Sequence, residues 1–423
     1  MRLPTFYRCH KACLWLALFF CSLTVTANAE NTAATLTLNE ALARTLAHNP
    51  QLYQYRFTKD ALEAQRQTSV LRPAMALELE VENVAGSGDT QGFDTAETTV
   101  ALSSVIEMGG KRQARVSYAD ARINQAEWEQ QAVSLDVLGE LTALYIESLA
   151  TQANMGLAEE SLGLSRSLLK TVKTRSKQGA TPEAEVMRAQ ASVARAEIRL
   201  AALVEQFERQ KVQLARFWGD TTPTLTTLEG SLSEFGGNQG FDQLYARVKT
   251  SPALQVLASE TRIRDAEVTL ARAGARSDLT WRAGITRFEE TGDTAFTAGL
   301  SIPLFSNNRS SGEVRAALAN RNAVDYARED LLLRVHAQLF EAYSLRKQSI
   351  AAATKTQNAV IPALEKALRL TREAYENGRY RYLDLIAAQE ELLATKQAYI
   401  DAASTALISQ ALIEKLSSEA LNR

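Results

Sequence analysis

The chain has 423 residues, of which 46% are hydrophobic, 23% are charged and 7% are aromatic. All three cysteines, Cys9, Cys13 and Cys21, precede residue 30, so disulfides, thiolate nucleophiles and cysteine-bound metals are excluded from the rest of the sequence. Beyond residue 29 the sequence has 44 Lys+Arg and 49 Asp+Glu, a net charge of −5 that gives no support to a nucleic-acid partner.

The first 29 residues have the pattern of a secretory signal peptide. They begin with basic residues and no acidic one, continue with an apolar run of 14 residues from Ala12 to Val25, and end in the small-residue pattern Ala27-Asn28-Ala29. The apolar run is too short to span a bilayer as a helix. We expect cleavage before Glu30 and export of the remaining chain.

Motifs from one half of the remaining chain return in the other half in the same order. The Asn-Pro motif at Pro50 returns as Ser-Pro at Pro252, Gly109-Gly110-Lys111-Arg112 returns as Asn307-Asn308-Arg309, and residues 179–190 return as 378–389. The offsets are 202, 198 and 199 residues. Chance similarity between alanine-rich helices would not keep proline and glycine in register. The pattern predicts a tandem duplication, with repeat 1 in residues 30–235 and repeat 2 in residues 236–423.

Repeat 1 begins with a predicted helix over about 38–71, which ends before Pro73. Alternating apolar and polar residues then predict strands over 76–84 and 97–106, joined by a loop rich in Gly, Ser and Asp. In the first strand the apolar face carries Leu77, Leu79 and Val81, and the opposite face carries Glu78, Glu80 and Glu82.

The second part of repeat 1 is predicted to be entirely helical. Residues 111–177 contain no proline and consist mainly of helix formers, which predicts a helix of roughly 100 Å. Gly179 and Pro182 mark its end, and a shorter helix follows over 182–217. The two short helices together match the long one in length. We therefore expect them to lie end to end alongside it as antiparallel rods, with the strand pair at a mid-chain turn of the rod and the Gly179 turn at the far end.

Repeat 2 follows the same plan, with helices and strands over 241–275, 278–288, 295–305, 313–377 and 381–421. Pro362 falls inside the predicted long helix and should kink it. Gly163 holds the matching place in repeat 1, so a kink is expected at equal depth in both repeats.

The four predicted strands have the length of tilted membrane-spanning strands. An open four-stranded sheet cannot lie in lipid, because its edges would be unsatisfied. Closed membrane barrels need at least eight strands. Three chains that contribute four strands each would give 12. A small soluble pair of hairpins that caps a helical bundle is the alternative.

Three stretches carry a resemblance to the TolC-like outer-membrane efflux factors. They are residues 105–112 (VIEMGGKR) with the counterpart 303–309 (PLFSNNR), the opening 38–42 (LNEAL) with Asn49-Pro50, and residues 361–389 with Pro362, Tyr375, Gly378 and Asp384. The resemblance covers essentially the whole chain after residue 29. The Glu-x-Gly-Gly-Lys-Arg form and the run 362–389 are similar to the CzcC-like branch, which serves heavy-metal efflux pumps of the resistance–nodulation–division (RND) class.

The resemblance implies a mainly α-helical fold with a small membrane β part, in which a homotrimer forms a helical barrel and shares a 12-stranded β-barrel. It implies a passive channel in the outer membrane of a Gram-negative bacterium, with a helical extension in the periplasm. The implied partners are a periplasmic adaptor protein, an inner-membrane RND pump and outer-membrane lipid. In this branch the implied substrates are heavy-metal cations. A duct for drugs or type I protein secretion, or a periplasmic coiled-coil scaffold, remain alternatives.

The resemblance also assigns a junction between barrel and helix, at Gly109, Gly110, Lys111, Arg112 and Arg309. The glycines would let the chain turn where bulkier residues would clash. The cations would lie near anionic lipid at the membrane boundary, although an ordinary solvated helix start would look the same.

Three acidic residues of the first strand, Glu78, Glu80 and Glu82, would face the lumen of such a barrel. Rings of carboxylates around a water-filled pore favour cations. An exposed polar strand face would give the same pattern of residues.

The periplasmic tip, which forms the gate and the adaptor-docking surface in TolC-like proteins, would contain Gly179, Glu185, Tyr375, Gly378, Tyr380 and Asp384. Asp384 would form a ring of three carboxylates around the axis, or six with Glu185. Capping of a helix N-terminus would explain the same acidic residues. The sequence departs from the family pattern at Tyr380, where an arginine is expected, and at Ala387, where a second aspartate is expected.

No catalytic, cofactor or metal site is expected. Beyond residue 29 the only histidines are His48 and His336, and neither has a second histidine at helical spacing to form a metal pair. The sequence has no GxSxG, P-loop or dinucleotide-binding motif.

Overall fold

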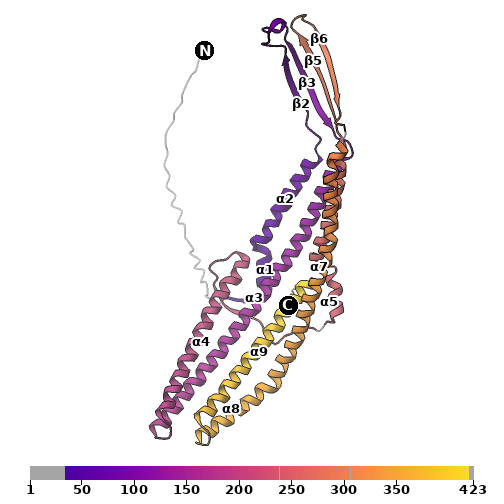
Figure 1. Cartoon of the computed structure of the whole chain (residues 1–423). Helices are drawn as coiled ribbons and strands as arrows, with labels where there is room; N and C mark the ends of the chain where they lie inside the picture. Colours follow the sequence, from indigo (N-terminus) through magenta and orange to yellow (C-terminus); the bar gives the residue numbers. More distant parts are fainter. Residues whose placement is uncertain (1–33, 238, 305, 419–423) are drawn as a thin grey trace, which may run out of the picture.

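The computed structural model describes residues 34–237, 239–304 and 306–418, except for the side chains of residues 306–309. The expected signal peptide, residues 1–29, lies outside the described residues. The described chain forms a long rod, with a sheet of strands at one end and two helical hairpins at the other (Figure 1).

One long helix organises the first half of the chain. The helices of this half are α1 (Leu38–His48), α2 (Pro50–Val70), α3 (Lys111–Lys177) and α4 (Glu183–Ala215), followed by the 3-10 turn η2 (Arg216–Trp218). Both α2 and α4 pack along α3, α2 toward the strands and α4 toward the opposite end (Figure 1). The predicted long helix and the arrangement of two shorter helices beside it are confirmed.

The second half contains more breaks than expected. Its helices are α5 (Phe241–Val248), α6 (Pro252–Gly274), α7 (Ser306–Lys355), α8 (Ile361–Glu376) and α9 (Tyr382–Ser417), with a π-helical turn η3 (Thr356–Val360) between α7 and α8. Both α6 and α9 pack along α7. No helix in the described ranges is long and apolar enough to cross a membrane.

The predicted helix over 38–71 is wrong as a single element, because Asn49 divides it. The backbone of Asn49 is extended, and its side-chain oxygen accepts hydrogen bonds from the N–H groups of Gln51 (2.9 Å) and Leu52 (3.2 Å). Pro50 then occupies the first position of α2, where its missing N–H costs nothing. Ser251 and Pro252 divide the predicted helix 241–275 at the corresponding place.

Only one of the two expected kinks has a structural counterpart. Pro362 has no N–H for the carbonyl four residues earlier, and the helix widens into η3 directly before it. The helix α3 continues as an α-helix through Gly163. Glycine keeps its N–H group, so the hydrogen-bond ladder is uninterrupted there.

Four strands form one antiparallel sheet with the order β2-β3-β5-β6. These strands are β2 (Ala76–Glu82), β3 (Glu97–Ile106), β5 (Leu279–Phe288) and β6 (Thr294–Ser301); a 3-10 turn, η1 (Gly88–Thr90), lies in the first loop. The central pair, β3 and β5, joins one half of the chain to the other. The strand β2 is shorter than predicted because the chain turns at Asn83 and Ala85, which both have a φ of 57°.

A second, two-stranded sheet lies partway along the rod and was not expected. In it β1 (Ala34–Thr37) pairs in parallel with β4 (Leu225–Glu229). The side chain of Tyr145, which is 1% exposed, reaches this sheet from α3. Its hydroxyl oxygen lies 2.7 Å from the carbonyl oxygens of Leu36 and Glu229, so the hydroxyl can donate to either. Burial raises the pKa of Tyr145 to about 12, which keeps this donor protonated.

Replacing Tyr145 by Phe tests whether this hydroxyl holds the small sheet on α3. We expect Y145F to lower the free energy of unfolding by about 1–3 kcal/mol, because the carbonyl groups of Leu36 and Glu229 lose the single donor that they share. Chemical unfolding of the purified protein in detergent measures the change. The matched control is Y53F, which removes a half-exposed hydroxyl that donates to Ala47 and should change the free energy by less than about 0.5 kcal/mol. Equal effects of the two variants would contradict this account of Tyr145.

Candidate functional site

The four-stranded sheet has two chemically different faces. In register across the strands, one face carries the apolar side chains of Leu77, Leu79, Val81, Val100, Leu102, Trp281, Ile285, Phe296 and Leu300. Most of these side chains are exposed, with Phe296 at 89% and Leu300 at 75%. An apolar surface of this extent on a single chain marks contact with a partner or a membrane.

The opposite face of the sheet is mostly polar or lined by small residues, with Val105 and Phe288 as larger apolar exceptions near its two ends. It carries the predicted acids Glu78, Glu80 and Glu82 on β2, as the alternation requires. Arg282 of β5 forms ion pairs with two of them, at 3.2 Å from Glu78 and 2.6 Å from Glu80. The hydroxyls of Thr99 and Thr286 meet at 2.8 Å between β3 and β5. Sequence reasoning found the acids but missed the arginine that balances two of them.

The junction between the sheet and α3 depends on two glycines. Gly109 and Gly110 have φ values of 69° and 75°, in the left-handed region that other residues rarely adopt. A Cβ atom on Gly109 would also lie 2.5 Å from Cγ of Arg276 and 2.7 Å from its Cβ, whereas no atom of the described residues lies within 4 Å of such an atom on Gly110. Gly109 is therefore restricted both by its backbone and by close packing on the segment that follows α6.

The two cations after these glycines have different environments. Lys111 forms an ion pair of 2.7 Å with Asp278, which also accepts a hydrogen bond of 3.0 Å from the N–H of Met108. Burial opposes ionisation of Asp278, but these hydrogen bonds outweigh it and lower its pKa. Arg112 is exposed. Arg309 lies in the first turns of α7, and its side chain is outside the described residues.

At the far end of the rod the two helical hairpins turn in the same way. Gly179 and Gly378 both have a φ of 74°. The N–H that follows each glycine donates to the carbonyl five residues earlier, Ala180 to Arg175 and Arg379 to Ala374, at 2.9 and 2.8 Å. This is the Schellman ending of a helix, which requires a left-handed residue and favours glycine.

Arg175 ties the two hairpin ends together. It lies in the last turn of α3 and donates to the carbonyl oxygens of Tyr375 (3.0 Å) and Glu376 (2.9 Å) at the end of α8. Its guanidinium also lies over the Tyr375 ring, 4.9 Å from the centroid. A cation at a helix C-terminus offsets the negative end of the helix dipole. This contact joins two hairpins that come from different halves of the chain. Sequence reasoning did not find it.

The predicted tip residues divide into a buried group and an exposed group. Tyr375 is 2% exposed and packs in a core with Val172, Val186 and Tyr382. Burial raises the pKa of the Tyr375 hydroxyl, and the nearby Glu185 carboxylate, in the first turn of α4, raises it further. Tyr380 is exposed on the turn.

Asp384 has a local partner. Its carboxylate accepts a hydrogen bond of 2.9 Å from the N–H of Arg381 and lies 3.3 Å from the Arg381 guanidinium, in a capping box at the start of α9. These hydrogen bonds hold the pKa of Asp384 below its usual range. The capping role considered from the sequence is therefore present, and the carboxylate remains ionised at neutral pH.

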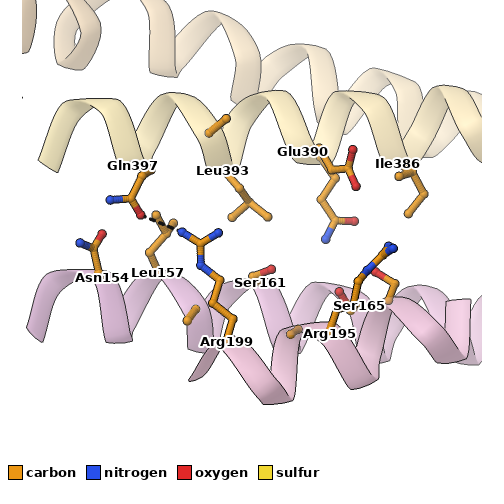
Figure 2. A pocket seen from close by; sticks show the side chains of 15 residues that line it. Asn154, Leu157, Ser161, Ser165, Arg195, Arg199, Ile386, Glu390, Leu393 and Gln397 are labelled. Atoms are coloured by element: carbon orange, nitrogen blue, oxygen red, sulfur yellow. Dashed lines mark hydrogen bonds between the residues drawn. The ribbon is translucent and has the colours of Figure 1, made fainter. Parts of the chain in front are cut away.

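A groove of about 500 Å³ lies where α3, α4 and α9 meet (Figure 2). Arg195 and Arg199 extend into it from α4, and Arg199 donates a hydrogen bond of 3.1 Å to Gln397 of α9. Glu390 lies on the α9 side. The groove therefore lies between the two hairpins, and its walls combine apolar side chains such as Leu157 and Leu393 with polar and charged ones.

Within the residues that the structure describes, no three His, Cys, Asp or Glu side chains come together to hold a metal ion. What the geometry does provide is a membrane-length sheet with an apolar face, a polar face of mixed charge, and helical hairpins that extend far from it. These features define a class, the TolC-like outer-membrane channels.

The chain belongs to the outer membrane efflux protein family, whose model matches residues 41–220 and 245–418. The cobalt-zinc-cadmium resistance protein CzcC of Cupriavidus metallidurans is 26% identical over 375 residues, which is 87% of this chain and 86% of CzcC. The nickel-cobalt-cadmium resistance protein NccC of Alcaligenes xylosoxydans xylosoxydans is 26% identical over 58% of this chain and 55% of its own length.

Solved structures show the same fold. CusC superimposes with a TM-score of 0.77 at 16% identity, over 90% of this chain and 91% of CusC. VceC of Vibrio cholerae superimposes with a TM-score of 0.72 at 21% identity, over 90% of this chain and 96% of VceC. The predicted family and TolC-like fold are confirmed. The protein is an outer-membrane efflux channel component with a periplasmic helical part, and its family consists of such passive components rather than enzymes.

Substitution of the two junction glycines separates the effect of backbone from the effect of packing. G110A should lower the free energy of unfolding by about 1–2 kcal/mol, because alanine is strained at positive φ. G109A has the same strain and also clashes with Arg276, so its loss should be clearly larger. Chemical unfolding in detergent measures both variants side by side. A G109A loss no larger than that of G110A would show that the close packing on Arg276 is unimportant.

Proposed function

We propose that the protein is the outer-membrane duct of a tripartite system that exports divalent heavy-metal cations. The similarity to CzcC over 87% of the chain carries this proposal. The relatives NccC and CnrC, named for nickel, cobalt or cadmium resistance, support the same substrate class. The polar sheet face with its carboxylates suits the passage of cations.

The duct is a homotrimer that closes a 12-stranded barrel in outer-membrane lipid. The exposed apolar face of the sheet supports this arrangement, because it would otherwise face water. The strands β2 and β6 are the edges of the single-chain sheet, and pairing β2 of one copy with β6 of the next would satisfy both. In this barrel Glu78, Glu80 and Glu82 face the lumen, and Arg112 lies at the membrane boundary near lipid phosphates.

The opposite end is the gate and the docking surface for a periplasmic adaptor, which connects the duct to an inner-membrane RND pump. The hairpin ends at Gly179 and Gly378 lie together, because Arg175 donates hydrogen bonds from one to the other. The groove between the hairpins, with Arg195 and Arg199, offers charged groups to an adaptor that approaches from the side. Asp384 and Glu185 place carboxylates near the narrow end of the duct.

The two halves of the chain are repeats, residues 30–235 and 236–423. The Schellman turns at Gly179 and Gly378 support this division, since they match in φ and in hydrogen bonding. The helix breaks at Asn49-Pro50 and Ser251-Pro252 also correspond. The π-helical turn η3 has no counterpart in α3, so the halves differ in the shape of their long helices.

An organic substrate is the second candidate, because two relatives are named for the export of organic compounds. The pyoverdine export protein OpmQ is 23% identical over 67% of this chain, and the toluene efflux protein TtgF is 21% identical over 87%. A deletion strain distinguishes the candidates. We expect it to be hypersensitive to cobalt, zinc or cadmium, with growth restored by the intact gene and unchanged tolerance of toluene. Sensitivity to organic compounds alone would favour the second candidate.

Arg175 holds the tip in a closed arrangement within this proposal. R175Q removes the charge and the two hydrogen bonds to α8, so the hairpin ends should separate more easily. We expect a single-channel conductance in planar bilayers at least about twofold above that of the unaltered protein, because the narrowest section widens.

The control for Arg175 is R166Q, which removes an exposed guanidinium paired with Glu197 within one hairpin. It should leave the conductance unchanged. Equal conductance of R175Q and R166Q would contradict a gating role for Arg175. Absence of any conductance in the unaltered protein would contradict the duct itself and favour a coiled-coil scaffold.

A further inference from the structure

The charged residues of the four-stranded sheet are concentrated on one face. By strand register, Glu78, Glu80 and Glu82 of β2, Glu97 of β3 and Arg282 of β5 all point to the polar face. Arg287 is the one charged strand residue on the apolar face, near the loop end, and it pairs with Glu289. In the proposed barrel the polar face is the pore wall, so each chain contributes four carboxylates and one guanidinium.

Arg282 reaches across a whole strand to the acids. It belongs to β5, and the acids belong to β2, on the far side of β3. Its Nη2 lies 2.6 Å from Oε2 of Glu80, and its Nε lies 3.2 Å from Oε2 of Glu78. Ser103 of β3, between them, donates a hydrogen bond of 2.5 Å to Oε1 of Glu78. The guanidinium therefore occupies the space between the two carboxylates.

This cluster is open to water and ions. The side chains of Arg282, Glu78 and Glu80 are 38%, 41% and 46% exposed. Exposed ion pairs add little to the stability of the fold. The main effect of Arg282 is therefore the positive charge that it adds to this face of the sheet. The Debye screening length is about 8 Å at physiological salt. An ion that passes along the wall within this distance therefore interacts electrostatically with Arg282.

Two neighbouring carboxylates on one face are a strong attraction for a divalent cation. The wall of a channel must attract an ion strongly enough for the ion to enter. It must also bind the ion weakly enough for the ion to leave. Arg282 places a permanent cation in contact with both Glu78 and Glu80, so a divalent cation that contacts both carboxylates there would have to displace the guanidinium. Within the described residues neither Glu82 nor Glu97 forms an ion pair with a cation, and Glu97 accepts a hydrogen bond of 2.9 Å from the neutral side chain of Asn83.

We propose that Arg282 determines the ion selectivity of the pore wall, by occupying the space between Glu78 and Glu80 so that divalent cations pass without being held there. This proposal rests on the proposed duct function. The result is a wall that favours cations through its remaining acids and does not retain them. The effect comes from a residue of one half of the chain acting on two residues of the other half.

The experiment measures the ion selectivity of the purified full-length protein in planar bilayers under a KCl gradient. R282Q should raise the permeability ratio of potassium over chloride by at least about twofold, because two carboxylates lose their counter-charge. The same variant should be blocked by Co²⁺ at about tenfold lower concentration than the unaltered protein, because the vacated carboxylates bind the metal. The rise in selectivity should shrink at high salt.

Four further variants keep the test decisive. R287Q removes an arginine from the same strand on the opposite face and should leave both readouts unchanged. R282K keeps the charge and should stay close to the unaltered protein, which separates charge from structure. E80Q/R282Q restores the charge balance and should return the permeability ratio toward the original value, whereas E80Q alone should lower it.

The outcomes separate this inference from the duct proposal. A conducting protein in which R282Q and R287Q have the same selectivity and the same Co²⁺ block would overturn the role of Arg282 and leave the duct intact. If R282Q fails to assemble, E80Q is the remaining test. A permeability ratio of E80Q equal to that of the unaltered protein would also overturn the role of Arg282. A protein that does not conduct at all would instead overturn the duct proposal.

Discussion

The structure depends on one constraint, which is that a four-stranded sheet cannot satisfy its own edges or hide its own apolar face. Leu77, Leu79, Phe296 and Leu300 remain exposed on the single chain, and no strand among the described residues pairs with the outer edge of β2 or β6. Water is a poor environment for that face, and lipid is a poor environment for open edges. Assembly of several copies in a membrane resolves both conflicts at once.

The long helices connect the four-stranded sheet to the distant tip, where the two helical hairpins turn. Gly109 and Gly110 turn the chain from β3 into α3, which then runs for 67 residues without interruption to the tip. The small β1–β4 sheet and Tyr145 fix α3 partway along. This continuous helix therefore joins the tip to an end that Lys111 and Asp278 anchor beside the sheet.

Local sequence patterns predicted the elements well but not the contacts between halves. The absence of proline from 111–177, alternation in the strands and the tip glycines are all visible within short windows. The contacts of Arg175 with Tyr375, Arg282 with Glu80 and Lys111 with Asp278 join residues 200, 202 and 167 positions apart. Each partner is an ordinary charged or aromatic residue in its own segment. The β1–β4 pair was missed because strands of four and five residues are too short to show alternation.

The most direct test of the account is cross-linking between the two sheet edges. The chain after residue 29 has no cysteine, so V81C on β2 and T294C on β6 would supply the only thiols there. Both residues lie in the same row of the sheet, at its loop end. With a short bis-maleimide reagent in outer membranes, the account predicts covalent species that end at the trimer. Monomers alone, or a ladder that continues beyond three copies, would contradict closure of the barrel by three chains.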